Sequence, residues 1–174
     1  MNEIPQILES KEEVIYDGKP EYAPYITSAI FGILIVVIII GIFVGVFIKS
    51  ILLAIVAGVI ILILGIVLSN MAYTRTHYAI TNKRAIIQSG IIGRDFKSID
   101  YDRMQNVSVD VGILGVIFKV GSIKIFTGEM ETVNTGRYGT SIKAKYDKFR
   151  YVINAYETLK KLQTELSKRK EELS

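Results

Sequence analysis

The chain has 174 residues, of which 50% are hydrophobic, and it carries a formal net charge of +4 with no cysteine and a single histidine, His77. Without cysteine, disulfides, thiol nucleophiles and thiolate metal sites are excluded, and one histidine excludes a multi-histidine metal site. Residues 1–24 are acidic and residues 75–150 are basic. A basic segment suits an anionic membrane surface or an acidic partner, although an ordinary solvated surface has the same composition.

Residues 1–24 contain two lysines and six acidic residues, and we expect them to form an acidic cytoplasmic segment. Two apolar stretches follow, at 25–48 and 51–69. A bilayer core takes about 20 apolar residues as a helix, and only a helix satisfies the backbone of a single span internally. The sequence therefore predicts a transmembrane helical hairpin over residues 25–70. An acidic lead-in and a second span argue against a signal peptide.

The orientation of this hairpin follows from the basic residues that flank it, because these stay on the cytoplasmic side. The tip offers only Lys49. The basic residues near the other ends are Lys11, Lys19, Arg75, Lys83 and Arg84. We therefore expect a multi-pass protein of the cell membrane with both termini in the cytoplasm.

Small residues recur at four-residue spacing in both stretches, as Gly41 with Gly45 and Ala54 with Gly58. This spacing lets helices approach closely. It indicates either a dimer face or packing of one hairpin helix against the other. No charged side chain lies in the middle of either stretch, so the sequence predicts no ion or proton pathway there.

Residues 71–174 have the pattern of a small β-domain. Apolar and polar residues alternate, as in Val107, Val109 and Val111, which is typical of strands that are buried on one face. Two strand-like runs are separated only by Asn82 and Lys83, which predicts a tight hairpin. Frequent turn signals favour an antiparallel sandwich or a partly open barrel. Residues 128–140, rich in glycine, indicate a long hairpin or a mobile loop.

A helix is predicted at about 155–172. Asn154 followed by Glu157 resembles a capping box. Leucines then recur at helical spacing at Leu159, Leu162, Leu166 and Leu173. The predicted fold is a two-helix transmembrane hairpin followed by an all-β, partly open barrel or sandwich that this C-terminal helix closes.

Three motifs in the β-domain carry a family resemblance. They are "YAITNKRAIIQSGIIGR", "IDYDRMQNVSVDVGILG" and "GSIKIFT". Their order, after a two-helix hairpin with an acidic lead-in, resembles the membrane-anchored bacterial and archaeal PH-like (pleckstrin-homology-like) domain family. The resemblance implies a PH-like fold. The chain departs from the family pattern at Val116, where members often have a basic residue, and at Ala155, where they often have proline.

The sequence contains no convincing catalytic constellation. Asp100 and Asp102 are paired acids, but they lie in a predicted turn where solvated carboxylates are expected. No glycine-rich phosphate loop precedes a helix. Nucleic-acid binding would need basic residues with exposed aromatics, and although Phe126, Tyr138 and Tyr146 are candidates, we expect them in the core or at the membrane interface. We therefore predict a protein that is not an enzyme, holds no metal or cofactor, and does not bind nucleic acid.

One basic group is the candidate binding site: Lys83, Arg84, Arg94 and Lys97. In eukaryotic PH domains a basic first hairpin binds phosphorylated headgroups, because lysine and arginine donate charge-assisted hydrogen bonds to phosphate. The alternatives are a turn whose charges keep the sheet soluble, or a pair between Arg84 and Asp95. A strand of about eight residues rises ~25 Å, so the hairpin can lie beyond the screening length of the membrane.

These observations favour an interaction or scaffolding module that binds a protein partner or forms a homo-oligomer beside the membrane lipids. The alternative is a sensor of anionic lipid headgroups that uses the basic first hairpin.

Overall fold

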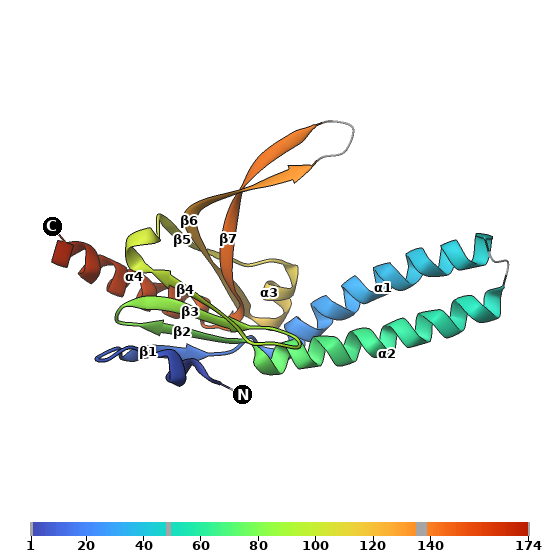
Figure 1. The fold of residues 1–174 in the computed structure, drawn as a ribbon, viewed down its shortest axis with the longest axis horizontal. Coiled ribbons are helices and arrows are strands. Elements are labelled where there is room, and N and C mark those ends of the chain that lie inside the picture. The colour runs from blue at the N-terminus through green and yellow to red at the C-terminus, as the bar shows by residue number, and fades with distance from the viewer. Residues whose placement is uncertain (1, 48–49, 135–138, 174) are drawn as a thin grey trace.

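The computed structural model describes residues 2–47, 50–134 and 139–173. Two long helices project together from one end of a β-domain, and a C-terminal helix lies at the other end (Figure 1). The predicted tip residue Lys49 lies outside the described residues.

Helices α1 (Tyr22–Phe47) and α2 (Ile51–Arg75) confirm the two predicted apolar helices. Both are long and apolar enough to cross a membrane, and their most apolar stretches have no buried residues inside the chain. At their domain end the ring of Tyr73 lies 4.9 Å from that of Tyr22 and 5.6 Å from that of Tyr25. Tyrosine is enriched where spans meet the membrane surface, so this cluster is typical of such a boundary.

The first sheet is antiparallel in the order β1 (Val14–Gly18), β2 (His77–Thr81), β3 (Arg84–Ser89) and β4 (Asp95–Asp100). The β2–β3 turn lies at Asn82 and Lys83, as the sequence predicted. Strand β1 comes from the segment that the sequence presented only as an acidic lead-in, and it pairs along β2.

The N-terminal segment also covers the outer face of this sheet. The 3-10 helix η1 (Ile4–Ile7) places Ile4, which is buried, against Ala79 of β2 and Ile86 of β3. Strand β2 is therefore buried on both faces, which explains why its sequence lacks strict alternation.

The second sheet is antiparallel in the order β5 (Asn106–Asp110), β6 (Val120–Asn134) and β7 (Thr140–Ile153). A short helix, α3 (Ile113–Phe118), connects β5 and β6 and was not predicted. It ends at Lys119, which has a left-handed φ of 55°. The far parts of β6 and β7 form a hairpin that stands clear of the rest of the domain (Figure 1).

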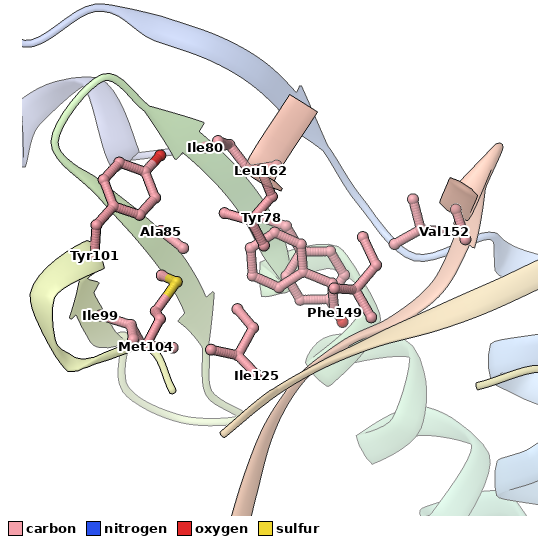
Figure 2. Close-up of a cluster of buried hydrophobic side chains, with 12 residues drawn as sticks. Tyr78, Ile80, Ala85, Ile99, Tyr101, Met104, Ile125, Phe149, Val152 and Leu162 are labelled. Atoms are coloured by element: carbon pink, nitrogen blue, oxygen red, sulfur yellow. The ribbon is translucent and has the colours of Figure 1, made fainter. Parts of the chain in front are cut away.

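The two sheets face each other across one hydrophobic core (Figure 2). Tyr78 of β2 stacks on Phe149 of β7, with ring centroids 4.7 Å apart and planes 5° from parallel. The buried members of the core include Ile80, Ile99, Tyr101, Met104, Ile123, Ile125 and Val152.

Helix α4 (Ala155–Leu173) buries Leu162 completely in this core, and Leu159 and Leu166 pack against it. The helix begins directly after Asn154, as predicted, and Asn154 itself has a left-handed φ of 53°. The side chain of Leu173 lies outside the described atoms. The sheets do not close into a barrel, so the prediction of a partly open domain with a C-terminal helix is confirmed.

Candidate interaction surfaces

The basic β2–β3 hairpin is bound to the acidic N-terminal segment. Arg84 donates to both carboxylate oxygens of Glu12, with Nε–Oε1 of 3.0 Å and Nη2–Oε2 of 2.9 Å. The Glu12 side chain is fully buried, and it also accepts from Thr81 Oγ1 at 2.8 Å and from the backbone N–H of Glu9 at 2.8 Å. Arg84 reaches the carbonyl of Ile7 as well, at 3.0 Å.

This network sets the charge of both partners. Burial alone would raise the pKa of Glu12, but the hydrogen bonds from Arg84, the Glu9 backbone and Thr81 outweigh burial and lower that pKa below its ordinary value. The hydrogen bonds to Glu12 raise the pKa of Arg84. Both groups are therefore charged at neutral pH, and each neutralises the other.

The other three predicted site residues are also ion-paired. Lys83 contacts Glu9 with an Nζ–Oε2 distance of 3.0 Å, and Arg94 pairs with Glu3. Lys97 of β4 pairs with Asp147 of β7 at 2.8 Å, which joins the two sheets.

The structure does not gather these four residues into one site. The β2–β3 turn, which contains Lys83 and precedes Arg84, lies at the end of the first sheet away from the two long helices. The β3–β4 connection, which contains Arg94, lies at the end beside them (Figure 1). The expected pair of Arg84 with Asp95 is wrong, because Asp95 lies opposite Ser89 at the other end of the ladder. Sequence reasoning missed Glu12 because its partner is 72 residues away.

The small residues of the two long helices differ in their surroundings. A Cβ on Gly58 would lie 3.2 Å from Val37 of the facing helix, and one on Gly65 would lie 2.7 Å from Ile33. These two glycines therefore allow α1 and α2 to pack closely. A Cβ on Gly41 or Gly45 would meet no heavy atom within 4 Å. Gly41, Gly45, Ala54 and Gly58 line a groove of about 460 Å³ between the helices.

A cavity of about 390 Å³ opens between the first sheet and β7, beside the base of α1. Its lining includes Tyr25, Lys97, Tyr146, Lys148 and Arg150. Within the described part of the chain, the head groups of Lys148 and Arg150 make no ion pair. In the sequence these two residues show only as basic positions in a strand. On the inner wall, burial raises the pKa of Tyr78 to about 12, so its hydroxyl stays neutral.

The projecting hairpin, residues 128–134 of β6 with 140–146 of β7, is here called the arm. Its strands pair Met130 with Ala144 and Thr132 with Ile142, and directly opposed residues share a face. On this face Met130 is 62% exposed and Ile142 is 73% exposed. The opposite face carries charges, with Lys145 and Glu129 paired at 3.0 Å.

The arm also has open backbone edges. Strand β5 pairs with β6 only as far as Phe126, and β7 is an edge strand of its sheet. Unpaired edges of this kind are templates for a strand from another chain. The sequence indicated a long hairpin here, although the tip, residues 135–138, lies outside the described residues.

Among the described residues, no group of three or more His, Asp or Glu side chains is arranged to hold a metal ion. Two facing antiparallel sheets with a C-terminal helix define a PH-like domain, here attached to two long apolar helices. The family model for the bacterial PH domain matches residues 24–170, and the chain belongs to that family. No curated protein and no solved structure matches the chain. PH domains are generally non-catalytic interaction modules.

Proposed function

We propose that this chain is a non-enzymatic, membrane-anchored interaction module that binds a protein partner, or assembles a membrane complex, on the cytoplasmic face. Anchoring is supported by α1 and α2, whose apolar side chains face outward rather than into the chain. Such a surface is costly in water and suits lipid.

The arm is the observation that carries partner binding. Its apolar face is exposed, and β7 has no neighbouring strand on its outer edge among the described residues. Apolar side chains beside an unpaired edge fit an extended segment of a partner, which adds backbone hydrogen bonds along the edge and inserts side chains against the face. The charged face is balanced, with Glu129 and Glu131 against Lys143 and Lys145, so it does not favour an anionic surface.

Partner binding is tested by co-purification from chemically crosslinked native membranes. Met130→Ser with Ile142→Ser should lose the co-purifying partner. Glu131→Ser with Lys143→Ser changes the other face of the same strands and should keep it. Loss in both variants, or retention in both, would show that the apolar face is not the binding surface.

The topology is tested separately, since the chain has no cysteine of its own. Ser50→Cys should react with an impermeant thiol reagent in intact cells, and Ser167→Cys on α4 should not. The reverse pattern would place the domain outside and exclude a cytoplasmic partner.

A second candidate function is the sensing of anionic lipid headgroups. It is favoured by Lys148 and Arg150, which make no ion pair with any residue that the structure describes. They line the cavity together with Tyr25 of α1, and lysine and arginine donate charge-assisted hydrogen bonds to phosphate. The first hairpin is less suited, since Glu9 and Glu12 neutralise it. Lys148→Gln with Arg150→Gln should reduce retention of anionic lipid on the purified chain in native mass spectrometry. Lys83→Gln with Arg84→Gln should leave it unchanged.

A further inference from the structure

Two apolar segments of the β-domain flank the bases of the long helices. Helix α3 contacts α1. On the other side, Arg75 at the end of α2 donates a hydrogen bond to the carbonyl of Ile91 in the β3–β4 turn, and Ile91 also lines a cavity with residues of both long helices. Figure 1 shows α3 and this turn at the end of the domain from which α1 and α2 leave.

Both segments expose large apolar side chains. Ile92 at the turn is 89% exposed, and on α3 Ile113 is 82%, Val116 71% and Ile117 64% exposed. Helix α3 reads ILGVIF and has no polar side chain at all. Isolated exposed apolar residues are ordinary, but this group is concentrated at one end of the domain.

The fold holds α3 in this exposed position. A Cβ on Gly115 would lie 2.6 Å from the carbonyl oxygen of Val120, so the helix packs its glycine side tightly on the start of β6. At 100° per residue, Ile113 and Ile117 lie on the side of the helix opposite Gly115. They cannot turn inward without breaking this contact.

We propose that α3 and the β3–β4 turn form a second membrane-contact surface, which seats the β-domain on the lipid bilayer. The proposal rests on the membrane anchoring proposed above. Lipid is the occupant because the surface continues directly from the two apolar helices on both sides, and because the helix face carries no group that could pair with a polar partner. Apolar side chains of this kind enter the boundary between headgroups and acyl chains.

The chain contains no tryptophan, so one introduced tryptophan is a unique reporter. The full chain would be reconstituted in lipid vesicles, with and without brominated acyl chains, which quench tryptophan on contact. The two test variants are Ile113→Trp and Ile92→Trp, which lie on separate segments and report independently. Phe31→Trp, in the middle part of α1, is the control for membrane insertion. Val14→Trp is the negative control, because Val14 is an exposed apolar residue near the opposite end of the first sheet.

We expect strong quenching by brominated lipid in Phe31→Trp, Ile113→Trp and Ile92→Trp, and none in Val14→Trp. If Phe31→Trp alone is quenched, the chain is anchored but the second contact surface is wrong. Quenching at only one of the two test positions contradicts a joint surface. Emission that is shifted to the blue without quenching assigns the surface to protein, such as a second copy, and also overturns the proposal. No quenching in Phe31→Trp overturns the anchoring itself.

Discussion

Strands β6 and β7 pair along one continuous ladder, but its two halves have different surroundings. In the near half, Ile123, Ile125 and Phe149 are fully buried between the sheets. In the far half, the arm, Met130 is 62% and Ile142 is 73% exposed. The register shifts between Phe126 and Met130, where Gly128 has a φ of 85°.

This difference shows that strand pairing and burial are separate properties. Pairing needs only a neighbouring backbone, whereas burial needs a second layer. The first sheet and α4 supply that layer for the near half, whereas the outer part of the arm stands clear of the domain (Figure 1). The near half therefore stabilises the domain, and the arm is free to serve an external contact.

The largest expected effect is in the near half. Phe149→Ala removes a ring that is fully buried and stacked on Tyr78, so we expect a loss of about 3–5 kcal/mol in the free energy of unfolding. Denaturant unfolding of the full chain in detergent would measure it. Tyr156→Ala is the control, since Tyr156 is 71% exposed. Equal losses in the two variants would contradict the assignment of the core.

The next effect concerns the N-terminal segment that covers the first sheet. Glu12→Gln leaves Arg84 without its buried carboxylate and should cost about 1–3 kcal/mol of stability. Glu13→Gln removes the same charge from an exposed neighbour and should change stability by less than about 0.5 kcal/mol. The two variants are compared by the midpoints of their denaturant unfolding. Similar midpoints would show that the buried network does not stabilise the fold.

The same pair gives a pH dependence. The pKa of Glu12 is lowered on folding from its ordinary value of 4.5, so the unfolded chain binds the proton more tightly. Its contribution to stability is fully present above pH 4.5 and is lost as the pH falls through the lower folded value. The stability difference between the unsubstituted chain and Glu12→Gln should therefore shrink on acidification below pH 4.5. A stability difference that instead grows below pH 4.5 would contradict this prediction.

The smallest effect on stability is expected in the arm. Met130→Ser with Ile142→Ser removes side chains that are already exposed, so the free energy of unfolding should change by no more than about 0.5 kcal/mol. A larger loss would mean that this face packs within the folded chain and is not free for a partner.

The parts of the fold that depend on local pattern could be predicted from the sequence. Asn82 and Lys83 predicted the turn of the first hairpin, and the two unbroken apolar stretches predicted the two long helices. Strand β1 could not be predicted, because a five-residue strand is specified mainly by the β2 edge that it joins. Helix α3 was missed because ILGVIF has the isoleucine and valine content of a strand.

The candidate site was less predictable than the fold. The basic residues Lys83 and Arg84 were visible, but Glu9 and Glu12, which neutralise them, approach only after the N-terminal segment folds onto the sheet. The exposure of the arm depends on how far the first sheet extends over β6 and β7. The residue patterns of β6 and β7 themselves do not indicate that extent.

The most direct test of partner binding is site-specific photo-crosslinking in native membranes, with a photoreactive residue placed at Ile142 or, on the opposite face, at Lys143. We expect a discrete adduct with one protein from position 142 and little or none from position 143. No discrete protein adduct from position 142, or the same adducts with equal yield from both faces, would contradict the claim that the apolar face of the arm binds the partner.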